Sequence, residues 1–205
     1  EAIEPFDLGL RVKNSGFGDA VNLKIESAQP EIIENDQGLL IDFKLLDSFV
    51  QDEPVNNSLL IDFGDIPSQS SKMGRWNMST TLSGTFTDFT ADFTHADELG
   101  GELTSLLEQV NTHILIHDVI VDESGRDSVK DFLAADVFDT TTRQYDLIKV
   151  YESNSTTTPA TNQSATAVFD ASGNDTEGYA FSFNPTAGFA YAEVSDPFGG
   201  NKEVL

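Results

Sequence analysis

The sequence contains no cysteine, so the chain has neither disulfides nor a thiolate that could act as a nucleophile or metal ligand. Secreted eukaryotic domains often carry disulfides and cytosolic proteins often carry free thiols, so this absence favours a prokaryotic extracellular protein. No apolar run approaches the ~18 residues that a membrane span requires. With no signal-peptide pattern at Glu1, we expect a mature, soluble chain without a membrane span.

Positive charge is scarce. Eleven Lys and Arg face 35 Asp and Glu, which gives a net charge of −24 and a pI near 4.1. The imbalance runs through both parts of the chain, before and after Asp122. Such a field repels nucleic acid and anionic lipid, so we expect no nucleic-acid partner. Two explanations remain open: a solvated acidic surface in a salty exterior, or sites for divalent cations.

Recognisable catalytic motifs are also missing. There is no Gly-X-Ser-X-Gly elbow, and no glycine-rich phosphate loop follows an expected strand. A glycosidase needs a pair of carboxylates, but 35 acids guarantee such pairs by chance and therefore give no signal. The sequence predicts a protein that is not an enzyme.

Apolar residues alternate with polar ones in several segments, the period of a strand with one buried face. Examples are 8–12, 21–25, 39–45 and 59–63, and turn-rich segments separate them. This spacing is typical of an antiparallel β-sandwich. Shared parity predicts the following core: Leu10, Val12, Leu23, Ile41, Phe43, Ile61, Phe63, Trp76, Phe89 and Phe93.

The alternation stops at residues 122–127, where we expect a linker or a sharp corner. Before it, residues 103–110 have a short helical period, although a strand is an open alternative, and 113–121 reads as a buried strand. After it we expect strands at 147–151, 165–169, 179–183 and 189–194, with a mobile loop at 153–164. We therefore predict one β domain over 1–122 and a second, smaller β domain over 123–205.

The run VKNSGFGDAVNLKI at 12–25 resembles the opening hairpin of CARDB-type and related immunoglobulin-like modules of large bacterial surface proteins. The later FGDIP at 63–67 is similar to their turn before the closing strands, with Ser68 where they have Gly. The resemblance covers about residues 5–95. It implies an immunoglobulin-like sandwich in a multidomain extracellular protein, without catalytic residues. Independently of any family, Asn14, Gly16 and Asp19 suit a tight turn.

Two acidic segments are candidate calcium sites. The first joins the two predicted domains and contains Asp118, Asp122 and Asp127. The second has oxygen-bearing side chains at Asp170, Asn174 and Asp175, although its spacing is not that of an EF-hand. A solvated corner explains the first segment equally well, and a polar hairpin tip is the favoured interpretation of the second.

His113 and His117 would form a metal pair on a helix, but their apolar context reads as a strand. Four residues along a strand span roughly 13 Å, too far for shared ligation. We therefore favour structural roles for both histidines.

The leading hypothesis is a non-catalytic extracellular structural or adhesive module, either one of a string of domains or the subunit of a surface fibre. Its partners would be neighbouring domains or identical subunits, and residues 1–6 and 200–205 are the candidate segments for strand exchange between them. The alternative is a carbohydrate-binding module for surface glycans, in which Trp76, Tyr179 and Tyr191 form a stacking platform. A lone Trp in a sandwich is more often part of the core.

Overall fold

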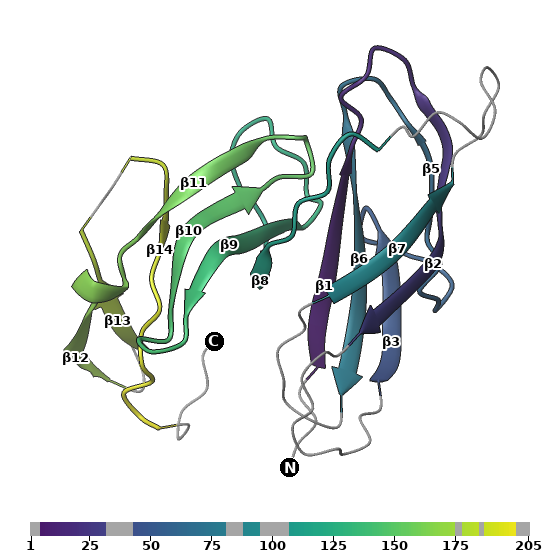
Figure 1. The fold of residues 1–205 in the computed structure, drawn as a ribbon. Helices are drawn as coiled ribbons and strands as arrows, with labels where there is room; N and C mark the ends of the chain where they lie inside the picture. Colours follow the sequence, from purple (N-terminus) through teal and green to yellow (C-terminus); the bar gives the residue numbers. More distant parts are fainter. Residues whose placement is uncertain are drawn as a thin grey trace.

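The computed structural model describes residues 5–31, 43–80, 88–94, 107–174, 178–184 and 187–199. These residues form a nearly all-β protein with four sheets, and all but one of its strand pairings are antiparallel (Figure 1). The strands are β1 (Pro5–Lys13), β2 (Ala20–Glu31), β3 (Phe43–Val50), β4 (Glu53–Pro54), β5 (Asp62–Ile66), β6 (Ser71–Thr80), β7 (Asp88–Thr94), β8 (Ile114–Val119), β9 (Asp131–Asp139), β10 (Gln144–Tyr151), β11 (Thr157–Asn162), β12 (Val168–Asn174), β13 (Gly178–Ser182) and β14 (Phe189–Tyr191). The sequence-based prediction of an all-β, sandwich-type fold is confirmed.

The N-terminal strands form the sandwich. One sheet has the order β1-β6-β3-β4 and the other β5-β2-β7. Between them lies a core of fully buried side chains: Ile25, Ile61, Phe63, Ile66, Trp76 and Met78. These residues come from both sheets: Trp76 and Met78 lie at alternate positions of β6, and the others lie on β2, on β5 or directly before β5.

The predicted core is confirmed where its side chains are described. Ile61, Phe63 and Trp76 are buried, and Leu10, Val12 and Leu23 are partly buried and pack against them. Ile41 and the side chains of Phe43, Phe89 and Phe93 lie outside the described part of the structure.

The C-terminal strands form a second sheet of order β14-β11-β10-β9-β8 and a separate hairpin, β12-β13. β8 pairs with β9, so the strand expected at 113–121 is part of the C-terminal sheet. The sequence had grouped this segment with residues 1–122. The division into domains at residue 122 itself stays a prediction.

Two expectations for this part were wrong. The predicted loop at 153–164 contains β11, which pairs with β10 and β14. β9 was not predicted at all, although it pairs with both β8 and β10. In the predicted helix at 103–110, residues 103–106 lie outside the described ranges, whereas Leu107 and Val110 are exposed in a segment without regular structure.

A set of polar contacts, here called the seam, joins the sandwich to the C-terminal sheet. Ser71 Oγ donates a hydrogen bond to the carbonyl oxygen of Ser153, and the backbone N–H of Lys130 donates to Asp52. β1 approaches the C-terminal sheet closely at Gly9, where a Cβ atom would lie 2.6 Å from the ring of Phe132. A glycine is required there because any side chain would overlap the ring.

No helix in the described ranges is long and apolar enough to cross a membrane.

Candidate functional site

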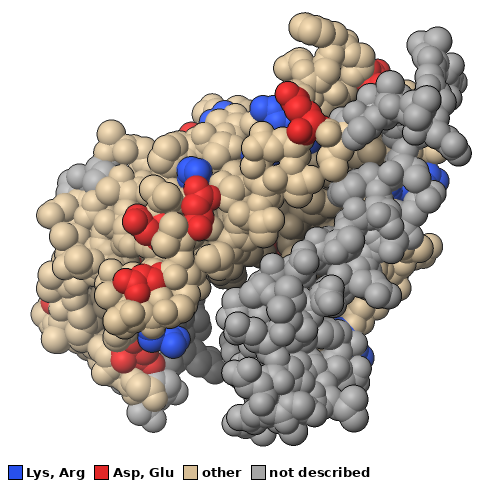
Figure 2. Space-filling view, in the orientation of Figure 1, with Lys and Arg blue, Asp and Glu red and all other residues tan. Residues whose placement is uncertain are grey.

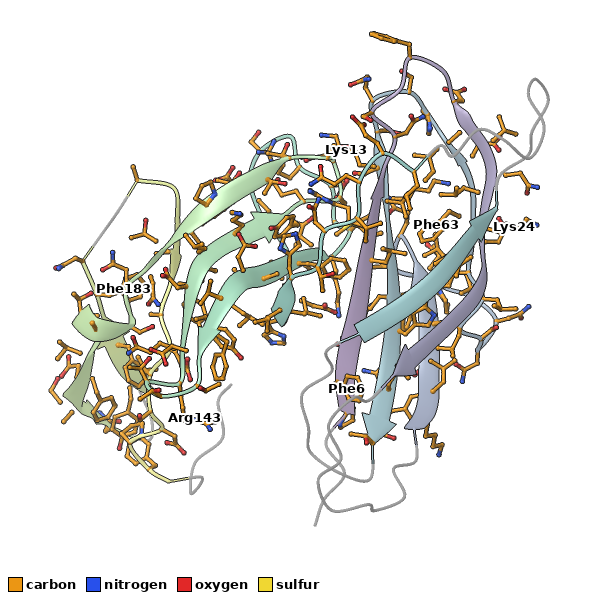
Figure 3. All side chains as sticks on the ribbon, viewed as in Figure 1. Phe6, Lys13, Lys24, Phe63, Arg143 and Phe183 are labelled. Carbon is orange, nitrogen blue, oxygen red and sulfur yellow. The ribbon has the colours of Figure 1, made fainter. Side chains whose placement is uncertain are left out.

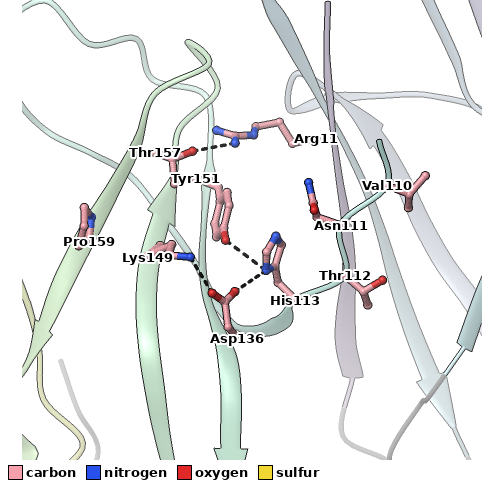
Figure 4. Close-up of a pocket in the computed structure, with 10 residues that line it drawn as sticks. All are labelled: Arg11, Val110, Asn111, Thr112, His113, Asp136, Lys149, Tyr151, Thr157 and Pro159. Carbon is pink, nitrogen blue, oxygen red and sulfur yellow. Dashed lines mark hydrogen bonds and ion pairs between the residues drawn. The ribbon is translucent and has the colours of Figure 1, made fainter. Parts of the chain in front are cut away.

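A pocket of about 710 Å³ opens beside the seam (Figure 4). β1 contributes one wall, β9, β10 and β11 contribute the other, and the segment before β8 closes one side. The lining side chains are Arg11, Val110, Asn111, Thr112, His113, Asp136, Lys149, Tyr151, Thr157 and Pro159.

Asp136 on β9 links two basic groups of the pocket. Its carboxylate accepts a hydrogen bond from Lys149 Nζ at 2.6 Å, and its other oxygen lies 2.6 Å from His113 Nδ1. The bond from Lys149, followed by that from His113, lowers the pKa of Asp136, and the same carboxylate raises the pKa of Lys149. Because an ionised carboxylate only accepts hydrogen bonds, we assign the Nδ1 proton of His113 to this contact.

Tyr151 on β10 lies between Arg11 and His113. The Arg11 guanidinium is 4.9 Å from the centre of the tyrosine ring, and the His113 ring is centred 4.6 Å away. Tyr151 Oη is also 3.1 Å from His113 Nδ1. Burial raises the pKa of Tyr151 and Asp136 adds to this rise, so the phenol is neutral at physiological pH.

Arg11 reaches across the seam from β1. Its Nη1 donates to the carbonyl oxygens of Thr156 at 2.7 Å and Glu152 at 3.2 Å, and its Nη2 donates to Thr157 Oγ1 at 2.8 Å. Burial lowers the pKa of Arg11, although a guanidinium stays charged at any physiological pH. All three acceptors are uncharged, so these bonds orient the guanidinium without neutralising it.

The arrangement offers charged and hydrogen-bonding groups to a ligand. His113 and Asp136 have the geometry of an oriented imidazole, but in the described part of the chain no hydroxyl or thiol hydrogen-bonds to Nε2 of His113.

The carboxylates of the first predicted calcium segment do not come together, because each has a different environment. The buried carboxylate of Asp118 forms ion pairs with Arg75 at 3.2 Å and Lys130 at 3.6 Å. Burial raises the pKa of Asp118, Asp7 adds to the rise, and the two cations oppose it.

The other two residues of this segment lie elsewhere. Asp127 accepts hydrogen bonds from Ser153 Oγ and from the backbone N–H of Val129, and Asp122 is exposed. The described residues contain no group of three His, Asp or Glu side chains placed to hold a metal.

The second predicted calcium segment is a hairpin. A side-chain hydrogen bond with Ser172, followed by one from the backbone N–H of Ser172, lowers the pKa of the Asp170 carboxyl. Asn174 pairs with Gly178 in the β12-β13 ladder. Asp175 lies outside the described residues. Calcium at either segment stays a prediction.

The tip between β1 and β2 is a second candidate site. Asn14 Nδ2 donates to the carbonyl oxygens of Gly18 at 2.8 Å and Ile66 at 3.0 Å, and Asn14 Oδ1 accepts from the N–H of Gly16 at 2.9 Å. The turn predicted around Asn14 and Gly16 is confirmed. The side chain of Phe17, at its apex, is 100% exposed.

Further hydrogen bonds tie this tip to the β5-β6 connection. Asp19 Oδ1 accepts from the N–H of Ser68 at 2.9 Å, and Gln69 Nε2 donates to the carbonyl oxygens of Ser15 at 2.6 Å and Gly16 at 2.9 Å. Three parts of the chain thus fix the backbone that carries Phe17. We call residues 14–19 the tip loop.

The proposed sugar-stacking platform does not form. Trp76 is fully buried in the sandwich core, and its indole N–H donates to the carbonyl oxygen of Ser58. Tyr179 packs against Phe169 and Phe198. The alternative reading of Trp76 as a core residue is the correct one.

Sequence reasoning missed most of the pocket. Arg11, Asp136, Lys149 and Tyr151 were not singled out, and His113 was weighed only as a metal ligand. The one available signal was a polar histidine in an otherwise apolar strand, and its partners lie far away in the sequence.

The acidic residues do not gather into one patch on the face shown in Figure 2, where several of them have Lys or Arg beside them. Searches for similar proteins found no matching family model, no matching curated protein and no matching solved structure.

Proposed function

We propose that this chain is a non-catalytic adhesive or structural module of a prokaryotic extracellular protein, either one domain of a surface array or the subunit of a fibre. The observation that carries the proposal is the fixed tip loop with its bare aromatic side chain. Its partner is an identical subunit or a neighbouring domain.

A fully exposed phenylalanine is unfavourable in water, whereas its burial against a partner is worth roughly 1.5–3 kcal/mol. Binding usually also requires that a mobile loop be ordered, at a cost in entropy. Here the hydrogen bonds of Asn14, Asp19 and Gln69 have already ordered the backbone. The tip loop therefore has the two properties of an anchor residue: apolar area and preorganisation.

The seam supports the structural part of the proposal. Arg11, Ser71 and Asp52 each bond to residues directly before or after the strands of the C-terminal sheet. A module that holds neighbours at a defined spacing needs such fixed joints between its parts, because unlinked domains move relative to one another. Figure 3 shows Lys13, at the end of β1, beside the C-terminal strands.

Charge sets the condition for contact between copies. Two chains of net charge −24 repel each other at low ionic strength, and the repulsion is screened beyond ~8 Å in physiological salt. Association through Phe17 should therefore strengthen as salt is added.

Sedimentation velocity over a range of protein concentrations in high salt tests the proposal. We expect the wild-type chain to associate and Phe17→Ser to remain monomeric. The matched control is Val168→Ser, which removes another exposed apolar side chain, on β12, and should associate like the wild type. Equal behaviour of the wild type and Phe17→Ser would contradict a role for the tip loop in contact between subunits.

A further inference from the structure

We propose that the pocket beside the seam binds a carboxylated sugar, such as a uronic acid. Lys149 would receive the carboxylate, and Arg11 and neighbouring polar side chains would receive the hydroxyl groups. This site is separate from the tip loop and does not depend on the function proposed for it.

Charge is the first argument. Two permanent cations, Arg11 and Lys149, share the pocket with one carboxylate, Asp136. Among the lining side chains, Lys and Arg thus outnumber Asp and Glu by one, in a chain whose Asp and Glu outnumber Lys and Arg by 35 to 11. Such a local reversal of sign attracts an anion.

The two acidic residues near Arg11, Asp131 and Glu152, form bonds with other groups. Asp131 accepts hydrogen bonds from the backbone N–H groups of Ser153 at 2.7 Å and Val121 at 3.2 Å. Glu152 forms an ion pair with Arg126 at 2.6 Å. Asp131 and Glu152 still act on Arg11 through their charge and raise its pKa, but in the described structure neither forms an ion pair with it. The bonds to residues 152, 156 and 157 use three of the five N–H donors of Arg11, which leaves two for a ligand.

The second cation is partly free as well. Lys149 Nζ has three N–H donors, and the described residues engage one of them, through Asp136. In Figure 4, Tyr151 lies between Arg11 and Lys149, so the two cations would contact different parts of a ligand.

The remaining lining suits a polyhydroxylated ligand. Thr112 and Thr157 provide hydroxyl groups, Asn111 provides an amide, and Asp136 keeps lone pairs that accept hydrogen bonds. A volume of about 710 Å³ exceeds the needs of a bare ion and falls within the range of pockets for small organic ligands.

The size of the charge excess favours a carboxylate over a phosphate. One positive charge balances one carboxylate, whereas a phosphate monoester with a charge near −2 leaves an uncompensated charge close to Asp136. The net charge of −24 makes an uncompensated negative charge in the pocket more unfavourable still.

Amide NMR of the isotope-labelled 205-residue chain, titrated with each candidate ligand, tests the site. We expect glucuronate to shift the amide signals of residues 109–113 and 149–157, with glucose and acetate binding at least about tenfold more weakly. Acetate that binds as well as glucuronate would overturn the sugar assignment, and glucose that binds as well would overturn the role of the cations. A chain that shows no shifts with glucuronate would overturn the site itself.

Variants separate this site from general charge effects. Lys149→Met removes one cation of the pocket and should weaken glucuronate binding at least about tenfold. The Lys149 side chain is 34% exposed, so we expect the variant to fold. The control is Lys24→Met, which removes an equal charge from an exposed ion pair of the sandwich and should bind like the wild type. Unchanged binding by a folded Lys149→Met chain, or equal loss in both variants, would overturn the proposal.

Discussion

The sandwich and the C-terminal sheet are both β structures, antiparallel except where β11 pairs with β14, but different interactions contribute to them. The sandwich encloses Phe63, Trp76 and four further apolar side chains between two sheets. The C-terminal part also buries apolar side chains, among them Phe132, Ile148 and Val150, but it buries the carboxylates of Asp131 and Glu152 beside them. Apolar burial therefore stabilises both parts, whereas the second also depends on satisfied polar groups and on the seam.

The largest effect should come from the sandwich core. Phe63→Ala removes a ring that is 1% exposed and packs against Gly74, and should destabilise the protein by about 3–5 kcal/mol. Phe17→Ala makes the same chemical change at a fully exposed position and should leave the stability within about 0.5 kcal/mol of the wild type. Urea denaturation of both variants measures the difference. Equal losses would mean that the tip loop belongs to the folded core.

The second largest effect should come from Arg75 on β6. It pairs with Asp52 and Asp118 at 3.2 Å, lies 3.8 Å from Asp7, and stacks on the ring of Phe49. Arg75→Met would leave three carboxylates without their shared cation, and we expect a loss of about 3 kcal/mol.

Lys24→Met is the matched control for Arg75→Met. Its ion pair with Asp62 is exposed on both sides and should be worth less than about 1 kcal/mol. Thermal unfolding of the two variants compares a buried charge cluster with a surface pair. Similar losses would show that the Arg75 cluster contributes no more than an ordinary surface contact.

The seam can be loosened without a change of charge. Gly9→Ala places a Cβ atom 2.6 Å from the Phe132 ring, so the two parts must separate slightly, at a cost of about 1–3 kcal/mol. Gly18→Ala adds the same atom where nothing lies within 4 Å and should be nearly neutral. Limited proteolysis should detect earlier cleavage in the C-terminal sheet of the Gly9→Ala protein. Unchanged cleavage would show that β1 and Phe132 do not restrain each other.

The smallest effect concerns Asp118 and depends on pH. Its pKa is raised in the folded state, so the stabilising contribution of the protonated form is fully present below the unfolded pKa of ~3.9 and is lost as pH rises through the folded pKa. Asp118→Asn lacks this loss and should be as stable as the wild type, or slightly more stable, at pH 7. Stability curves from acidic to neutral pH test the sign. A clear loss at pH 7 would mean that its ion pairs outweigh the burial.

The sequence predicted the sandwich better than the C-terminal sheet for a physical reason. In β1 and β2 apolar residues recur at every second position, because successive side chains of a strand point to opposite faces and one face meets the sandwich core. β9 buries the adjacent residues Ala134 and Ala135, and β11 contains Pro159 and several polar residues. These two strands form because β10 pairs with both, and such tertiary context is not encoded in a local pattern.

The same contrast separates the two candidate sites. The tip loop was predictable because the Asn14 side chain bonds to Gly16 and Gly18, within its own turn. The pocket was not, because Arg11 meets Thr157 across 146 residues of sequence.

Native-state hydrogen exchange tests most directly whether the two parts are held by different interactions. Amides of β5 and β6 should exchange only through global unfolding, whereas those of β9 and β10 should open at a lower free energy. Added sodium chloride should lower the free energy of opening of β9 and β10 further, because it screens the charges at the seam. It should leave the free energy of opening of β5 and β6 unchanged. Equal protection of all four strands, unaffected by salt, would contradict the account.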